Sequence, residues 1–327
     1  MTKSQKNARS PALAGARLTA SRSAVLAVVF AVLTTALCAL PASSQTLPLT
    51  VCMAENNPPL SYLRAKELRG LDLLIAEAVS TELGRNLKVV PFESKYEPDS
   101  SLTHEVNALL SSGVCDMASG FPMLSTDLGA PTRATARVPD YPGAKRPPQR
   151  PWVPLGTLVA SHAYHAVALG MIMRDPSRES MTLAEPGNAR FGVTAGTMAG
   201  TLVTLYRNGK LRPQLDSLSQ DQNALEQLEA GRFDATLSSL DRYDAWRLEH
   251  PASTLRRGTY VNPLRINIGF VARAESTEVL DAANRVIDKA LVDGSLERMS
   301  VSAGATWIAP REPQIGSPIG LMDLTQQ

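Results

Sequence analysis

The sequence of 327 residues has few of the side chains that build metal clusters or disulfide frameworks. It contains three cysteines and four histidines, and aromatic residues make up only 5% of the chain. Structural zinc sites and small secreted disulfide scaffolds both need closely spaced sets of Cys or His. We therefore expect neither a metal site nor a cofactor.

Long apolar runs are also missing beyond residue 40, so no membrane-spanning segment is expected in the mature protein. The one apolar run, Ala24–Leu40, is shorter than the roughly 20 residues that a spanning helix needs. Basic residues precede this run, and the small-residue segment 41–44 follows it. This pattern predicts a secretory signal peptide over residues 1–44, cleaved after Ser44, and an uncleaved N-terminal anchor is the alternative.

The positive net charge of the full chain belongs to its first 44 residues. Removing them takes away five basic residues and no acidic ones, which leaves 28 basic against 31 acidic residues and a net charge of −3. The remaining chain of 283 residues (327 − 44) therefore lacks the basic surplus of a nucleic-acid-binding protein. It is long enough for one large domain or two ordinary ones.

Hydrophobic periodicity predicts alternating strands and helices. Strands are expected at 47–53, 87–92 and 115–119, with a helix at 71–83 and a second helix ending at Gly113. A similar pattern follows between residues 191 and 238, and a last helix is expected from Ser276. The order β-α-β-α-β predicts an α/β fold, with mostly parallel sheets flanked by helices.

Two cysteines remain after processing, Cys52 and Cys115. In the flavodoxin-like strand order the first and third strands are neighbours, which brings these two residues near one another. In an oxidising compartment they are expected to form a disulfide, and two unpaired buried thiols are the alternative.

Several short motifs occur in an order and spacing that resemble bacterial extracellular solute-binding protein family 3. They are the proline turn Asn57–Ser61, the segment Gly70–Asp72 leading to Leu83–Gly84, and the segments Leu109–Asp116, Phe191–Thr197 and Leu228–Ala235. The resemblance implies the periplasmic-binding-protein type II architecture, with two lobes joined by two hinge crossings. The crossings are expected at Ser161–Tyr164 and at Pro263–Ile268.

This resemblance sets the expected domain boundaries. Lobe 1 covers residues 45–163 and includes a Pro/Arg-rich surface loop at 127–155, while lobe 2 covers 164–264. Residues 265–308 return to lobe 1. The proline-bearing tail at 309–327 is expected to be loose.

Ligands of such sheets bind at the carboxyl ends of the strands. The candidate ligand-binding residues in the corresponding loops are Glu55, Asn57, Tyr62, Gly120, Thr126, Gly196, Thr197, Ser239 and Asp241. The turn at 195–197 is the candidate anion contact, because free N–H groups at a helix start attract anions, and an ordinary strand-to-helix turn is the alternative.

The chain departs from the family pattern at two positions. No arginine stands beside Thr126, where the family usually grips an α-carboxylate, although Arg133 or Arg137 could reach in from the loop. Ser239 stands where the family often has an aspartate, and Asp241 follows two residues later.

The function implied by the resemblance is capture of a small polar solute for an inner-membrane ABC-type transporter, by a monomeric periplasmic protein that is not an enzyme. A second resemblance, carried by Gly113–Asp116, Gly120–Pro122 and Cys52, is to binding-like proteins associated with quinoprotein methanol dehydrogenases. That resemblance implies an accessory role toward a periplasmic dehydrogenase. A dehydratase-like enzyme is the third alternative, with Glu55 as its candidate acid.

Overall fold

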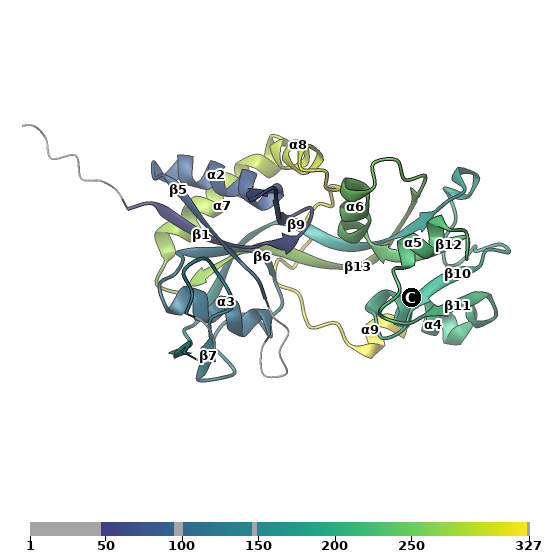
Figure 1. Cartoon of the computed structure of the whole chain (residues 1–327), viewed down its shortest axis with the longest axis horizontal. Helices are drawn as coiled ribbons and strands as arrows, with labels where there is room; N and C mark the ends of the chain where they lie inside the picture. Colours follow the sequence, from purple (N-terminus) through teal and green to yellow (C-terminus); the bar gives the residue numbers. More distant parts are fainter. Residues whose placement is uncertain (1–46, 95–100, 146–148, 326–327) are drawn as a thin grey trace, which may run out of the picture. The chain divides into compact units, whose positions relative to one another are not determined.

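The computed structural model describes residues 47–94, 101–145 and 149–325 (Figure 1). The signal-peptide prediction for residues 1–44 lies outside these ranges. The strands of the main sheet are β1 (Leu49–Ala54), β5 (Leu87–Phe92), β6 (Met117–Pro122), β9 (Leu158–Met173), β10 (Phe191–Thr194), β11 (Leu215–Leu218), β12 (Ala235–Ser239) and β13 (Arg256–Arg273). The helices are α2 (Leu71–Leu83), α3 (Leu102–Ser111), α4 (Met198–Gly209), α5 (Ala224–Glu229), α6 (Leu240–Glu249), α7 (Thr277–Val292), α8 (Ser295–Ser302) and α9 (Leu321–Thr325). Five short strands and two 3-10 turns complete the set: β2 (Asn56–Asn57), β3 (Ser61–Arg64), β4 (Glu67–Arg69), β7 (Thr135–Arg137), β8 (Trp152–Pro154), η1 (Pro176–Arg178) and η2 (Arg212–Gln214).

The eight main strands form one sheet in the order β11-β10-β12-β9-β13-β6-β1-β5. At one end β1 pairs in parallel with β5 and β6, and at the other end β10 pairs in parallel with β11 and β12. This confirms the predicted α/β class with mostly parallel strands. It also confirms that the first and third predicted strands, β1 and β6, are neighbours.

Two long antiparallel strands, β9 and β13, join the two parallel ends of the sheet. They pair with each other along much of their length, while β9 also pairs with β12 and β13 with β6. Both predicted crossing segments lie in these strands, where His165 is in register with Ile268. Their role as hinges stays a prediction.

Apolar side chains cover both faces of each end of the sheet. In the N-terminal part, α2 and α7 bury Ile75, Val79 and Ile287 against one face, and α3 buries Leu109 against the other. In the C-terminal part α4 covers one face, while α5 and α6 cover the other. Burying a Leu or Ile side chain contributes about 1.5–3 kcal/mol relative to leaving it exposed. The buried face of each helix therefore carries apolar residues at a 3.6-residue period, and this period predicted the helices.

Helix α2 begins at a backbone constraint that only glycine satisfies. Gly70 has φ +122°, and a Cβ there would lie 2.2 Å from the carbonyl oxygen of Leu60. The amides of Leu71 and Asp72 donate to the carbonyls of Pro59 and Leu60. The proline turn is thereby held against the start of the helix, and Asp72 is fixed inside the fold.

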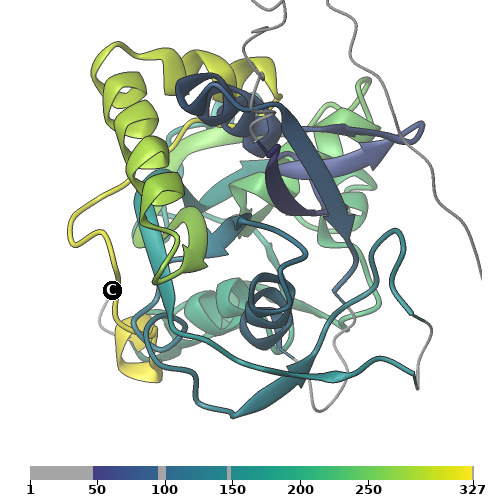
Figure 2. The ribbon, with the colours of Figure 1, turned by 90° about the vertical axis from the view of Figure 1, so that its left-hand side faces the viewer.

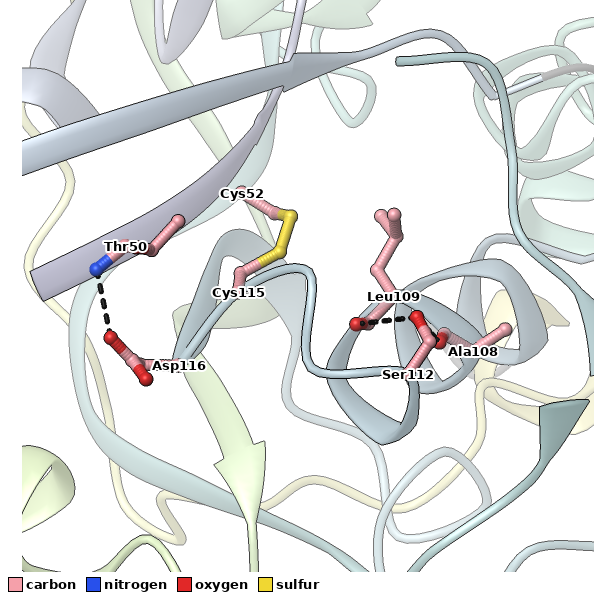
Figure 3. The surroundings of a disulfide bond; sticks show 7 residues. All are labelled: Thr50, Cys52, Ala108, Leu109, Ser112, Cys115 and Asp116. Carbon is pink, nitrogen blue, oxygen red and sulfur yellow. Dashed lines mark hydrogen bonds between the residues drawn. A yellow bond between two sulfur atoms is a disulfide. The ribbon is translucent and has the colours of Figure 1, made fainter. Parts of the chain in front are cut away.

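The predicted disulfide joins Cys52 on β1 to Cys115, with the two Cα atoms 5.7 Å apart (Figure 3). Cys115 lies just before β6 instead of within it, because the strand begins at Met117. Asp116 is held beside the bridge, since the amide of Thr50 donates to its carboxylate at 2.8 Å.

The Pro/Arg-rich segment at 127–155 is more structured than the sequence suggested. Strands β7 and β8 form an antiparallel ribbon within it, and Ala136, Val138 and Val153 are buried against α3. The prolines exclude long regular elements, but the apolar residues between them still anchor the segment to the fold.

Residues 309–325, which were expected to be loose, make specific hydrogen bonds with the rest of the fold. Asn267 of β13 donates to the carbonyl of Arg311 at 2.7 Å and accepts from its amide, and the amide of Gly316 donates to Met123. The segment, yellow in Figures 1 and 2, then ends in α9, where Leu324 packs against the apolar cluster under α4. We call residues 309–325 the C-terminal strap. The prolines of the strap all precede α9, and the stretch that contains them is held by hydrogen bonds from side chains.

Within the described ranges, no helix has both the length and the apolar character required to cross a lipid bilayer.

Candidate ligand-binding cleft

A cavity of about 600 Å³ opens where the carboxyl ends of β1, β5 and β12 meet the start of α6. Residues from both parallel ends of the sheet line it, together with Val167 of β9 and Ile266 of β13. We call this cavity the cleft. Its position at the carboxyl ends of the strands is where an α/β sheet of this kind places a ligand.

Four of the predicted residues line the cleft: Asn57, Gly120, Ser239 and Asp241. They come from β2, from β6, and from the junction of β12 with α6. The proline turn, which includes a cis peptide bond between Pro58 and Pro59, places Asn57 at this edge.

The other predicted residues lie elsewhere. Glu55 and Tyr62 line an adjoining cavity of about 350 Å³ between the β2-β3-β4 sheet and α6, which shares Asn56, Pro58 and Ala245 with the cleft. Thr197 lines a side cavity of about 210 Å³ that shares Ser239 and Arg242 with the cleft. Gly196 and Thr126 belong to none of these three cavities.

The turn at 195–197 is shaped as a helix start. The hydroxyl of Thr197 caps α4 by accepting from the amide of Gly200 at 3.0 Å, and it donates to the carbonyl of Thr194. Gly196 has φ +74°, and a Cβ there would meet the amide side chain of Gln220. The turn thus starts α4 with Thr197 beside the side cavity, and the anion contact at this turn stays a prediction.

A buried hydrogen-bond network supports the floor of the cleft. Asp72 accepts from the hydroxyls of Ser119 at 2.6 Å and Tyr164 at 2.7 Å, and the Tyr164 hydroxyl accepts from the amide of Gly120 at 2.8 Å. Gly120 has φ +66°, and a Cβ there would approach Asp72 to 3.1 Å. The network therefore fixes Ser119 and Gly120 where the cleft meets β6.

Burial dominates the titration of this network. Desolvation raises the pKa of Asp72 above its usual range, although the hydrogen bonds from Ser119 and Tyr164 oppose that effect. Desolvation and the neighbouring Asp72 carboxyl raise the pKa of Tyr164. Tyr164 consequently keeps its proton and acts as a donor to Asp72.

Asp241 is the acidic residue of α6 that faces the cleft, and a buried histidine stands behind it. Nε2 of His165 lies 3.2 Å from Oδ1 of Asp241, with the two side chains 0% and 13% exposed. Nδ1 of His165 has no hydrogen-bond partner among the described residues. The orientation of Asp241 is thus set from inside the protein by β9.

Three charged residues line the cleft within the described part of the chain: Glu93 from the end of β5, Asp241, and Arg242. Arg242 is exposed and makes no hydrogen bond or ion pair with any described residue. It is the functional candidate that the sequence analysis missed, together with Glu93. Both residues lie close to the end of a strand, which could have marked them as candidates. The sequence does not show, however, which residues in the first turn of a helix face a cavity.

The two arginines of the Pro/Arg-rich segment that could have reached in do not line the cleft. The guanidinium of Arg137 lies over the ring of Trp152, 4.8 Å from its centroid, on the β7-β8 ribbon. Arg133 acts on the pKa of His104 at α3, and neither arginine lines the cleft. Among the described residues, the cation that lines the cleft comes from α6.

No family model matches the chain, and no curated protein is significantly similar to it in sequence. Solved structures do match. Substrate-binding domain 2 of Lactococcus lactis GlnP, in an open conformation, is 12% identical, with a TM-score of 0.58 over 81% of this chain and 98% of that one. The unliganded, open L-cystine solute receptor of Neisseria gonorrhoeae is 17% identical, with a TM-score of 0.57 over 81% and 95% of the two chains.

An ancestral cationic amino acid solute-binding protein is 15% identical, with a TM-score of 0.53 over 78% of this chain and 94% of that one. This chain has their two-lobed, solute-binding-protein fold. At such low identity the likeness establishes the fold alone. These neighbours give no support to the resemblance with proteins of the methanol dehydrogenase type.

Proposed function

We propose that this chain is an extracytoplasmic solute-binding protein, which captures one small polar ligand in the cleft and delivers it to an ABC-type importer. The observation that carries the proposal is the composition of the cleft, where residues from both parallel ends of the sheet meet around one cavity. The solved structures with this fold are named as solute receptors and substrate-binding domains, which supports binding in preference to catalysis.

The charges of the cleft suggest what the ligand carries. Arg242 offers guanidinium donors to a carboxylate, while Asp241 and Glu93 offer acceptors to a cationic group. Apolar side chains such as Phe92 and Ile268 line much of the remaining wall. A zwitterionic solute with a modest apolar part, such as an amino acid, fits this set of groups.

A screen of polar solutes by thermal shift tests the proposal. A ligand that binds only the folded state raises the melting temperature as its concentration passes its dissociation constant. We expect saturable stabilisation by at least one zwitterionic solute. We also expect Asp241→Asn and Arg242→Ala each to weaken that binding about tenfold or more, a loss that corresponds to one good charged contact.

Asp175→Asn is the matched control, because Asp175 caps η1 on the surface and lies outside the cleft. It should leave the ligand response unchanged. If no amino acid, organic acid or organic cation stabilises the wild-type protein, the proposed function is wrong.

A further inference from the structure

A second cavity of about 600 Å³ lies against a different set of α6 residues from those that line the cleft. Its walls come from α6, from the start of β13, and from the segment that follows α8. Arg247, Arg256 and Arg257 line it. We call it the arginine pocket.

Arg257 interacts electrostatically with Asp244, but the guanidinium groups of this pocket form few direct contacts with the surrounding protein. Arg247 and Arg257 are exposed and form no hydrogen bond or ion pair within the described part of the chain. Arg256 donates only to the backbone carbonyls of Leu255 at 2.9 Å and Ser253 at 3.4 Å. These bonds orient its side chain and leave its other N–H groups available.

Among the described residues, Asp244 supplies the carboxylate that lines the arginine pocket, and each of its oxygens already accepts a hydrogen bond. Asp244 is buried, accepts from the hydroxyl of Thr306 at 2.9 Å, and also accepts from the amide of Thr306. Three guanidinium groups therefore face one engaged carboxylate, so the pocket carries a net positive charge. Arginine is the side chain best suited to grip carboxylate or phosphate oxygens in pairs.

We propose that the arginine pocket is a second binding site, separate from the cleft, that takes a small multivalent oxyanion of the carboxylate, phosphate or sulfate type. The inference does not rest on the proposed function, because it uses other residues and another cavity. Leu248 and the exposed Val301 on its rim also allow a short carbon chain between the charges of the ligand.

Calorimetric titration with sodium sulfate tests the proposal, because sulfate keeps its charge across the accessible pH range. Sodium chloride at equal ionic strength serves as the reference for general screening. We expect saturable sulfate binding to the wild-type protein. The Arg247→Ala, Arg257→Ala double variant should bind sulfate at least about tenfold more weakly, since two close charges are removed. Both side chains are exposed, so this variant is expected to fold, which circular dichroism would verify.

Two matched variants locate the bound anion. Arg69→Ala removes one exposed arginine on β4, outside the pocket, and should leave the affinity unchanged. Arg242→Ala removes the cation of the cleft and should also leave sulfate affinity unchanged. The proposal is overturned if sulfate acts no differently from chloride, or if Arg242→Ala weakens binding as much as the double variant does. Replacing sulfate with phosphate or citrate then tells which oxyanion the pocket prefers.

Discussion

The imidazole of His165, fully buried on β9, lies 3.2 Å from the carboxylate of Asp241 at the start of α6. This contact joins a strand that connects the two ends of the sheet to the acidic wall of the cleft. A second histidine on the same strand, His162, pairs with Asp288 at 2.7 Å. In this pair both side chains are about half exposed. The two pairs allow a matched comparison.

Replacing His165 with Ala should destabilise the protein by about 2–4 kcal/mol, because it leaves a cavity and takes the partner from a mostly buried carboxylate. His162→Ala should cost only about 0–1 kcal/mol, as exposed ion pairs do. Urea unfolding of both variants measures the difference. If both variants lost the same free energy of unfolding, the buried His165–Asp241 contact would contribute no more to stability than the exposed pair.

Asp244 should make the stability depend on pH. Burial raises its pKa to about 6 from the ordinary 3.8, so between these values the folded state holds a proton that the unfolded state has lost. The free energy of unfolding therefore falls as pH rises through this window, by on the order of 3 kcal/mol in total from this group. Asp244→Asn should remove that part of the slope, measured by urea unfolding between pH 4 and 7.

The control for Asp244 is Asp175→Asn. A backbone hydrogen bond from Ser177 lowers the pKa of Asp175, so its titration falls below that window. The slope between the two pKa values of Asp244 should then match that of the wild-type protein. A wild-type slope in Asp244→Asn would contradict the assignment.

The C-terminal strap should contribute to stability through Asn267. Its side-chain amide, 8% exposed, donates to the carbonyls of Arg311 and Gln314 at 2.7 and 3.0 Å. Asn267→Ala should cost about 1–3 kcal/mol, since it removes several hydrogen bonds that hold the strap to the buried Asn267. Asn284→Ala, which removes a single acceptor from the amide of His162, should cost less. Limited proteolysis would show whether the strap also becomes accessible to cleavage, and no change in either measurement would rule out a stabilising strap.

The disulfide should stabilise the N-terminal part of the fold substantially. Cys52 and Cys115 are 63 residues apart, and closing a loop of that size in the unfolded chain contributes about 4 kcal/mol in the chain-entropy model. The Cys52→Ala, Cys115→Ala double variant should lose most of this, measured as a lower urea midpoint. Reducing agent should lower the wild-type midpoint similarly and leave the double variant unaffected. If complete reduction of the disulfide left the urea midpoint of the wild-type protein unchanged, this prediction would be contradicted.

Apolar spacing and helix-ending glycines predicted the fold, because these local features determine where its helices and strands begin and end. Ile75 and Val79 recur at helical spacing, and Gly84 ends α2 in the left-handed conformation that glycine permits. The flavodoxin-like strand order places β1 beside β6, and this order predicted the disulfide. Where prolines dominate, as in the C-terminal strap, composition suggested looseness while long-range hydrogen bonds from Asn267 supply order.

The sequence predicted those residues of the candidate site that lie near the ends of predicted strands. Asn57 and Ser239 end strands, Asp241 follows one and Gly120 lies near the end of β6, and the sheet brings all four to one cavity. Glu55 stands only two residues from Asn57, yet it lines a different cavity because the short β2-β3-β4 sheet turns it toward α6. Which cavity a side chain lines depends on tertiary packing, and the spacing of residues in the sequence does not predict it.

The central claim is that the cleft binds one small polar solute. The most direct measurement is calorimetric titration of the wild-type protein with the zwitterionic solutes that stabilise it, beside Arg242→Ala under the same conditions. The expected result is one ligand per chain, with binding at least about tenfold weaker in the variant. The absence of saturable binding by every such solute, or equal affinity of both proteins, would contradict the account.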